Sequence, residues 1–293
     1  MLNSVLRHFG YYQEPRPLTE FLAFKETFES AKVAGLSVGD YIDSKQFSGP
    51  RSPTDQTIDG MAAVGVFDGR PLRICEIGPG SGRYLERTVA KCQPLYYEIY
   101  ETAAEWRDWL VAQHDAIARK CDGRTLAATE SASMALVQSH KLFPALPLLN
   151  TVSYLQEMAR VVQDDGWVVF DIITEACFSP HHVKAWLDAN PWHWPWAPHL
   201  ITKDFTLKFF ADRGIDFVDS FPVPLYPAIT ECMVFRKRSS QRRPTQDTQA
   251  SICNQTAELT GQFDTPDHRA SKWNTQESLW ELQRSAYGQA GGQ

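Results

Sequence analysis

The feature that most constrains the fold is a strand–turn–helix unit at residues 74–84, with the sequence ICEIGPGSGRY. The apolar run Leu72–Ile77 is typical of a short strand, and a helix is expected at Gly82–Lys91. Glycines let the backbone come close to a ligand, and the free amides at the start of a helix favour an electronegative group. The unit therefore predicts a nucleotide-type ligand at the end of this strand.

Strand-like and helix-like segments alternate from Leu72 to about Lys237. Strands separated by helices of this length form a parallel sheet with right-handed crossovers. The last two strands have no helix between them, which predicts a hairpin. The expected fold class is α/β, with a mostly parallel sheet, helices on both faces and a closing antiparallel hairpin. Further strands are expected at Leu95–Tyr100, Ala116–Cys121, Met134–Val137, Trp167–Ile173, Phe217–Phe221 and Thr230–Phe235, and helices around Trp106–Leu110, Pro147–Val162, His182–Ala189 and Lys203–Arg213.

Residues 1–65 are expected to form a helical extension before the central domain at 66–237. Phe21, Phe24 and Phe28 have helical spacing, Gly35 and Gly39 predict a break, and a second helix is expected after Ser52-Pro53. This extension is either a lid across the binding cleft or a layer packed on the sheet, because helix periodicity reports only that one face is buried.

Residues 238–293 are polar and begin with a basic run, which is typical of a disordered tail. A short helix near Gln276–Tyr287 is expected within this tail. The central domain also contains a tryptophan-rich insert at 189–199, with the sequence ANPWHWPWAPH.

Charge and cysteine content exclude several classes of function. The chain has 29 basic and 35 acidic side chains and a formal net charge of -6, whereas a nucleic-acid-binding domain is usually basic. Its six cysteines include no CxxC pair, so we expect neither a metal site nor a disulfide framework. We find no secretory leader and no apolar run that could cross a bilayer, and we expect a cytoplasmic protein.

The spacing of the glycines separates this turn from other nucleotide-binding turns. A dinucleotide fingerprint, GxGxxG, would need glycine at Arg83, and a phosphate loop would need a Gly-Lys-Ser/Thr ending. The segment instead resembles motif I of the class I S-adenosylmethionine-dependent methyltransferases, (E/D)xGxGxG, with Glu76, Gly78, Gly80 and Gly82 at its four defining positions. The resemblance implies S-adenosylmethionine as the cofactor and a Rossmann-like methyltransferase fold. It places Pro79 and Ser81 in the binding turn too.

The resemblance extends from about Leu72 to Val234 and implies further cofactor contacts. In this family an acidic residue at the end of the second strand accepts hydrogen bonds from both ribose hydroxyls. The resemblance implies this role for Glu101, with Glu98 as a second candidate. An acidic residue near the third strand contacts the adenine amino group, which implies Asp122 together with Gly123. Simpler interpretations stay open: Glu101 as an acid at a helix N-terminus and Asp122-Gly123 as a plain turn.

Methyl transfer to a hydroxyl is helped by a general base. His140 is the first candidate, because it follows the fourth strand at the sheet edge where open α/β sheets bind ligands. The alternative is a histidine that only hydrogen-bonds backbone. Candidates for acceptor contact lie at or beyond the fifth strand; they are Glu175, His181 and Trp194, with Asp171, His182 and Glu231 as further possibilities.

These features predict methyl transfer to a small-molecule acceptor, a hydroxyl on a sugar or other metabolite. No NPPY-like tetrapeptide follows the fourth strand, which argues against methylation of nucleobase or glutamine amino groups. One alternative is a catalytically silent methyltransferase-like binding subunit. Another is an NAD-type oxidoreductase on a similar sheet. The oligomeric state is not predicted.

Overall fold

The computed structural model describes residues 23–46, 51–189 and 199–239, and the statements below concern these residues. The chain divides into two compact units, Met1–Arg242 and Arg243–Gln293, and every described residue belongs to the first. The expected helix near Gln276–Tyr287, nearly all of the expected tail, and Trp194 lie outside the described residues.

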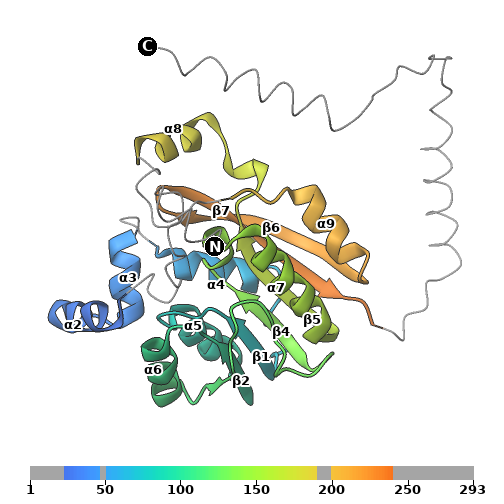
Figure 1. Cartoon of the computed structure of the whole chain (residues 1–293), viewed down its shortest axis with the longest axis horizontal. Coiled ribbons are helices and arrows are strands. Elements are labelled where there is room, and N and C mark those ends of the chain that lie inside the picture. The colour runs from blue at the N-terminus through green and yellow to red at the C-terminus, as the bar shows by residue number, and fades with distance from the viewer. Residues whose placement is uncertain (1–22, 47–50, 190–198, 240–293) are drawn as a thin grey trace, which may run out of the picture. The chain divides into compact units, whose positions relative to one another are not determined.

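The described part of the chain contains a seven-stranded sheet with the order β3-β2-β1-β4-β5-β7-β6 (Figure 1). Strands β1 to β5 pair in parallel, whereas β7 pairs antiparallel with both β5 and β6. The expected mostly parallel sheet with a closing antiparallel hairpin is therefore confirmed. The strands are β1 Arg73–Ile77, β2 Tyr96–Tyr100, β3 Ile117–Ala118, β4 Met134–Ser139, β5 Val162–Ile172, β6 Ile215–Leu225 and β7 Ala228–Lys237.

Helices cover both faces of this sheet, as expected. One core cluster joins the sheet to α7 and α9 and includes Tyr154, Leu155 and Phe210. The other joins it to α4, α5 and α6 and includes Met61 and Leu110. The helices are α2 Phe24–Ala34, α3 Val38–Gln46, α4 Pro53–Ala63, α5 Arg83–Cys92, α6 Ala104–His114, α7 Leu148–Val161, α8 Pro180–Asp188 and α9 Lys203–Ala211, with short 3-10 turns η2 Phe143–Ala145 and η3 Glu175–Cys177.

The N-terminal helices differ from the expectation at one glycine. The expected break is present, because α2 ends at Ala34, Gly35 has a left-handed backbone and α3 begins at Val38; Gly39 itself, however, lies inside α3 rather than in the break. A Cβ on Gly39 would lie 2.9 Å from Cβ of Arg83 on α5. Gly39 therefore lets α3 approach α5 closely, and tertiary packing outweighs its low helix propensity. The start of α4 is as expected, since the Ser52 hydroxyl accepts a hydrogen bond of 3.0 Å from the Asp55 amide.

Two strand boundaries also differ. Strand β5 begins at Val162 rather than Trp167, because Asp165, with a φ of 59°, is accommodated as an irregularity inside the strand. The β4–β5 register shifts between Met134 and Leu136. Strand β3 is shorter than expected, because it is an edge strand that pairs with β2 only at Glu98 and Ile99.

Candidate functional site

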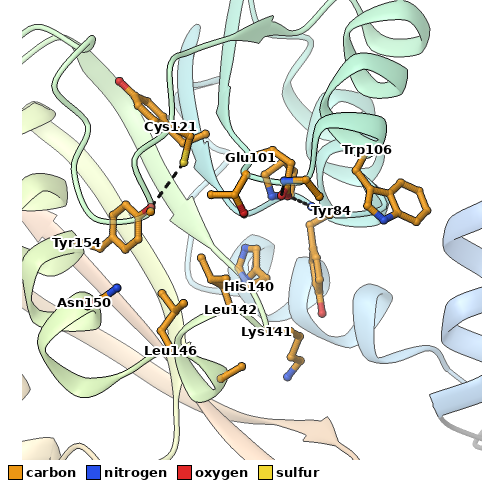
Figure 2. Close-up of a pocket in the computed structure, with 18 of the residues that line it drawn as sticks. Tyr84, Glu101, Trp106, Cys121, His140, Lys141, Leu142, Leu146, Asn150 and Tyr154 are labelled. Atoms are coloured by element: carbon orange, nitrogen blue, oxygen red, sulfur yellow. Dashed lines mark hydrogen bonds between the residues drawn. The ribbon is translucent and has the colours of Figure 1, made fainter. Parts of the chain in front are cut away.

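A cavity of about 430 Å³ lies where β1, β2 and β4 end at the carboxyl edge of the sheet (Figure 2). Its size is in the range of small-molecule sites, and the carboxyl edge is where open α/β sheets bind ligands. The loops after these strands bring together residues that are far apart in the sequence. The sequence-predicted residues on its wall are Gly78, Pro79, Gly80, Ser81, Glu101, Asp122, Gly123 and His140.

The glycine-rich turn forms one side of the cavity. The amide of Gly78 donates a hydrogen bond of 2.8 Å to the Tyr100 carbonyl, which ties the turn to the end of β2. Gly80 lines the cavity with a φ of 52°, and a Cβ built on it meets no atom within 4 Å. A ligand can therefore approach the Gly80 backbone closely. Gly82 does not line the cavity; a Cβ there would lie 2.3 Å from Cδ2 of Leu110 on α6.

Glu101 presents a buried carboxylate to the cavity, with an exposed fraction of 7%. Its Oε2 accepts a hydrogen bond of 2.9 Å from the Gly80 amide, and its Oε1 accepts one of 2.8 Å from the Ala103 amide. Burial raises the pKa of Glu101, and these two amides oppose the shift. A carboxylate has about four acceptor sites, so each oxygen retains capacity for a further donor such as a ribose hydroxyl.

Glu98, the second ribose candidate, lies away from the cavity. Its carboxylate is fully buried and accepts hydrogen bonds of 2.8 Å from Nε of Arg119 and from the Tyr96 hydroxyl. The Thr129 hydroxyl is a further donor to it. Glu98 lies in the middle of β2, where successive side chains point to opposite faces of the sheet. Glu101 comes after the last residue of β2, so only Glu101 is placed beyond the end of the strand.

Glu76 lies behind the glycine-rich turn and not on the cavity wall. It is 1% exposed, its Oε2 accepts a hydrogen bond from the Tyr97 hydroxyl, and its Oε1 has no hydrogen-bond partner among the described residues. Burial raises the pKa of Glu76 to about 7, while the hydrogen bond from Tyr97 and the nearby Gln138 amide oppose the shift. In the structure Glu76 is thus buried beside Tyr97 and does not line the cavity.

Asp122 and Gly123 line the cavity, and Asp122 also organises its own turn. Its Oδ1 accepts hydrogen bonds of 2.9 Å from the Arg124 amide and 2.7 Å from the Thr125 amide. The Thr125 hydroxyl donates to Oδ2 at 2.7 Å. Asp122 can therefore stabilise its own turn and also contact a ligand in the cavity, so the two interpretations left open by the sequence are compatible.

His140 is buried on the cavity wall, and neither ring nitrogen has a hydrogen-bond partner in the part of the chain that the structure describes. Its ring centroid lies 4.5 Å from that of Tyr84. Burial lowers the pKa of His140 to about 4, although the Asp171 carboxylate acts in the opposite direction. The imidazole is therefore neutral over the ordinary pH range and keeps a lone pair that can accept a proton. The alternative of a backbone-bonded histidine does not describe this ring.

The remaining acceptor candidates in the described part of the chain do not line the cavity. Glu175 accepts a hydrogen bond of 3.0 Å from the Lys203 amide at the start of α9. His181 is exposed on α8, and His182 bonds to Ser179 at the start of that helix. Glu231 pairs with Lys203 at 2.7 Å. Asp171 is buried beneath the loop that carries His140, and Trp194 lies outside the described residues.

Several cavity residues were missed by the sequence reasoning. Arg83 directly follows Gly82 of the motif, and Lys141 directly follows His140, so the sequence already indicated their positions. No pattern in the sequence assigned a role to either residue. Leu225 comes from the tip of the β6–β7 hairpin, and no local signal links it to the glycine-rich turn. The missed residues that matter most are Arg83, Tyr84, Trp106, Lys141, Leu142 and Leu225.

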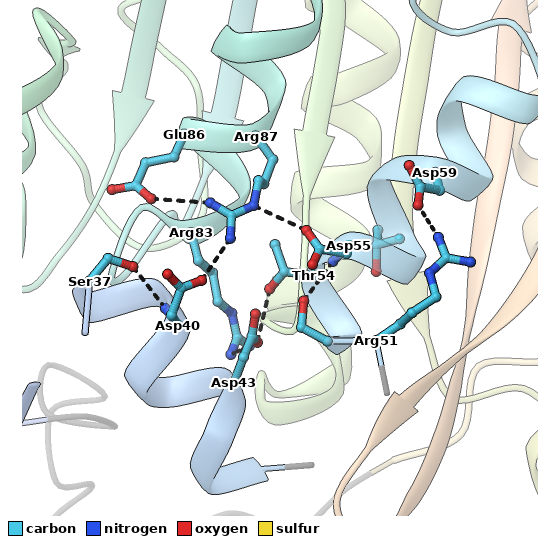
Figure 3. A network of polar contacts seen from close by, with 12 residues as sticks. Ser37, Asp40, Asp43, Arg51, Thr54, Asp55, Asp59, Arg83, Glu86 and Arg87 are labelled. Carbon is cyan, nitrogen blue, oxygen red and sulfur yellow. Dashed lines mark hydrogen bonds and ion pairs between the residues drawn. The ribbon is translucent and has the colours of Figure 1, made fainter. Parts of the chain in front are cut away.

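The N-terminal helices hold the cavity wall through ion pairs with α5 (Figure 3). Nη1 of Arg83 lies 3.0 Å from Oδ1 of Asp43 on α3, and both side chains are under 10% exposed. Thr54 on α4 donates a hydrogen bond of 3.0 Å to the same oxygen. Arg87, one turn further along α5, pairs with Asp40 and Asp55. Described residues before Gly78 do not line the cavity themselves, but they contact two residues that do: Asp43 pairs with Arg83, and the Phe24 ring packs on Trp106 at 4.9 Å between centroids.

The strand order, the antiparallel β7 and the glycine-rich turn after β1 define a Rossmann-like methyltransferase fold. Among solved structures, an O-methyltransferase family protein from Burkholderia thailandensis is similar, with a TM-score of 0.50, 12% sequence identity, and coverage of 82% of this chain and 69% of that chain. At this identity the similarity establishes the fold alone. No protein-family model matches the chain, and no curated protein matches it.

Two further solved structures are similar at lower TM-scores. Magnesium protoporphyrin IX methyltransferase from Synechocystis has a TM-score of 0.49 and 13% identity, covering 68% of this chain and 98% of that chain. The 1,6-didemethyltoxoflavin-N1-methyltransferase from Burkholderia thailandensis has a TM-score of 0.48 and 14% identity, covering 76% and 93%. In the described part of this chain, we find no helix with the length and apolar character needed to span a bilayer.

Proposed function

We propose that this chain binds S-adenosylmethionine in the cavity and transfers its methyl group to a hydroxyl of a small molecule, with His140 as the general base. One observation carries the proposal: the glycine-rich turn, the Glu101 carboxylate and an imidazole whose nitrogens have no hydrogen-bond partner among the described residues line the same cavity. The motif and the fold supply independent support, because both are typical of class I S-adenosylmethionine-dependent methyltransferases.

The residues present fit this cofactor. The open space above Gly80 accommodates a ligand at the turn, and Glu101 offers acceptor capacity to a ribose diol. Asp122 and Gly123 would face the adenine. The charge also fits, since carboxylates near the turn favour a ligand that carries a sulfonium and an ammonium but no phosphate.

When bound, S-adenosylmethionine supplies a methyl group on a sulfonium, and the C–S electron pair returns to sulfur as the acceptor oxygen bonds to the methyl carbon. The protein's part is to align the acceptor and exclude water. A ring nitrogen of His140 takes the hydroxyl proton and passes it to solvent. The oxygen gains positive charge as its bond to carbon forms, so its proton becomes acidic enough for a base with a pKa of about 4.

A small acceptor is supported by the surroundings of His140. The ring of Tyr84 lies 4.5 Å from that of His140, and Trp106, Leu142 and Leu225 line the same cavity, so apolar and aromatic groups form much of the wall available to an acceptor. The net charge of -6 argues against a polyanionic acceptor such as RNA.

The first test is binding of S-adenosylhomocysteine, measured as an increase in Tm of the full chain. Gly80→Val should abolish the increase, because its side chain would fill the cavity at the turn. Gly214→Val is the matched control: Gly214 also has a positive φ, 71°, and open space around it, but it does not line the cavity. Backbone strain should lower the Tm of both variants, whereas only Gly80→Val should lose the ligand-induced shift.

The rival classes give different results. A silent binding subunit would bind S-adenosylhomocysteine but transfer no methyl group to any small-molecule acceptor. An NAD-type oxidoreductase would show a change in nicotinamide absorbance with candidate substrates and no S-adenosylhomocysteine shift. S-adenosylhomocysteine binding that persists in Gly80→Val would mean that the glycine-rich turn is not part of the binding site.

A further inference from the structure

Asp171 on β5 receives hydrogen bonds from two other parts of the sheet although it does not line the cavity. It is 1% exposed. Its Oδ1 accepts a hydrogen bond of 2.6 Å from the amide of Lys141, the residue after His140. Its Oδ2 lies 3.1 Å from Nζ of Lys141 and accepts a hydrogen bond of 2.7 Å from the Thr230 hydroxyl on β7. One buried carboxylate thus holds Lys141 by both its backbone and its side chain.

Lys141 has a backbone conformation that needs such support. Its φ is 59°, in the left-handed region that L side chains other than asparagine and aspartate seldom adopt. Residues in such conformations persist where surrounding contacts fix them, and they concentrate at functional sites. The Lys141 ammonium also donates a hydrogen bond of 2.7 Å to Thr230, so β4, β5 and β7 are joined at this point.

The His140 ring cannot be held by its own hydrogen bonds, because neither nitrogen has a partner in the described part of the chain. Its ring contacts Tyr84, and its backbone continues directly into Lys141 (Figure 2). A base that must keep a nitrogen available for the acceptor has to be oriented by packing and by its backbone. The contact between Asp171 and the Lys141 amide supplies the backbone restraint.

We propose that Asp171 is a positioning residue: it clamps Lys141 in its left-handed conformation and so aims the His140 imidazole into the cavity. The proposal rests on the proposed function of His140 as the base. Asp171 acts through Lys141 and does not contact the acceptor. This role differs from the one expected from the sequence, where Asp171 was a candidate for acceptor contact. Burial alone would raise the pKa of Asp171, but Lys141, His140 and the hydrogen bonds hold it below its usual range, so the clamp stays ionised.

Histidine NMR of the full chain tests the clamp without relying on activity. The His140 signal is assigned by its loss in His140→Gln, and its titration is followed in Asp171→Asn. The charge of Asp171 raises the pKa of His140, so removal of the charge alone would lower that pKa further. Release of the loop would instead let water reach the ring, and we expect the pKa to rise from about 4 towards the ordinary value near 6.5. An unchanged or lower pKa would overturn the proposal.

Asp216→Asn is the matched control for this experiment. Asp216 forms an exposed ion pair with Arg238 at 2.7 Å and does not line the cavity. This variant should leave the His140 titration as it is in the wild type. A shift of equal size in Asp216→Asn would mean that the signal reports general loosening of the sheet, which contradicts a specific clamp.

A rescue experiment separates backbone restraint from charge. Asp171→Asn should lower methyl-transfer turnover by about 10²-fold, as expected for a misplaced catalytic group, with S-adenosylhomocysteine affinity within about threefold of wild type. Adding Lys141→Gly removes the unpaired ammonium and makes the positive φ favourable, whereas adding Lys141→Met removes only the ammonium. We expect the glycine double variant to recover at least about tenfold more turnover than the methionine double variant.

Equal turnover of the two double variants would overturn backbone restraint as the role of Asp171. If wild type showed no S-adenosylhomocysteine binding or transfer, the proposed function would fail, while the NMR titration would still test the clamp. If His140→Gln kept full turnover, His140 would not be the base. Normal turnover in Asp171→Asn beside an inactive His140→Gln would contradict the positioning role directly.

Discussion

The carboxylate of Glu101 accepts a hydrogen bond of 2.9 Å from the backbone amide of Gly80. This contact joins the end of β2 to the glycine-rich turn after β1, two parts of the chain that the proposed cofactor would bridge. Because the Ala103 amide holds the other carboxylate oxygen at 2.8 Å, the acid is oriented before any ligand binds. Pre-orientation of this kind reduces the entropy lost on binding.

Glu101→Ala should weaken S-adenosylhomocysteine binding by about 1.5–3 kcal/mol, the usual contribution of a hydrogen bond to a charged group. Isothermal titration calorimetry measures the change. Glu98→Ala is the matched control, because Glu98 is buried with Arg119 and Tyr96 away from the cavity. It should lower stability and leave affinity unchanged. The opposite pattern would assign the ribose to Glu98.

Glu76→Gln should change how stability depends on pH. The pKa of Glu76 is raised from 4.5 to about 7 by burial, so its protonated form stabilises the native state below pH 4.5, and this contribution is lost as pH rises through 7. Glutamine does not titrate, so the variant should gain up to about 3 kcal/mol on wild type between pH 5 and 8. Urea unfolding across this range measures the difference, with the exposed Glu105→Gln as control. Parallel curves for wild type and Glu76→Gln would contradict this account.

His140→Gln should lower turnover by about 10²–10⁴-fold and leave S-adenosylhomocysteine affinity unchanged. The pH dependence of the wild type carries a second signature. Burial lowers the pKa of His140 from 6.5 to about 4, so the base stays neutral, and the rate is maintained, until the pH falls towards 4. A rate that halves near pH 6.5 would mean that His140 titrates as a solvated imidazole or that another group is the base.

Asp43→Asn should destabilise the attachment of α3, because it leaves the Arg83 guanidinium beside a neutral partner in a buried site. Removal of one member of a buried ion pair typically costs about 3–5 kcal/mol, and an asparagine that keeps the hydrogen bond should lie near the lower end. Asp59→Asn, which weakens the exposed contacts with Arg51 and Lys91, should cost less than about 1 kcal/mol. Urea unfolding compares the two, and equal losses would contradict a buried anchor at Asp43.

The sheet could be predicted from the sequence because the patterns that indicate its strands, turns and helices are local. Strand-like runs, a glycine-rich turn and helices of the right length lie in chain order, and the sheet topology follows from handedness and adjacency. The same locality placed Glu101 and His140, since each directly follows a strand whose end lies at the ligand-binding edge.

What the sequence did not reveal depends on packing between distant elements. The left-handed Lys141 is held by Asp171 and Thr230 from other strands, and nothing local to Lys141 predicts it. Gly39 reads as a helix break, yet it is the point where α3 approaches Arg83. Glu76 matches the motif, but its side chain is buried beside Tyr97 and does not line the cavity, a distinction that a consensus pattern does not carry.

Methyl transfer to a small molecule can be followed with a trideuterated methyl group. The full chain is incubated with S-adenosylmethionine labelled on the methyl carbon and with separate small-molecule, RNA and protein fractions, and products are identified by mass spectrometry. We expect wild type to add one labelled methyl group to a hydroxyl-bearing compound in the small-molecule fraction, and Gly80→Val to add none. Label found only in RNA or protein, or in no fraction at all, would contradict this expectation.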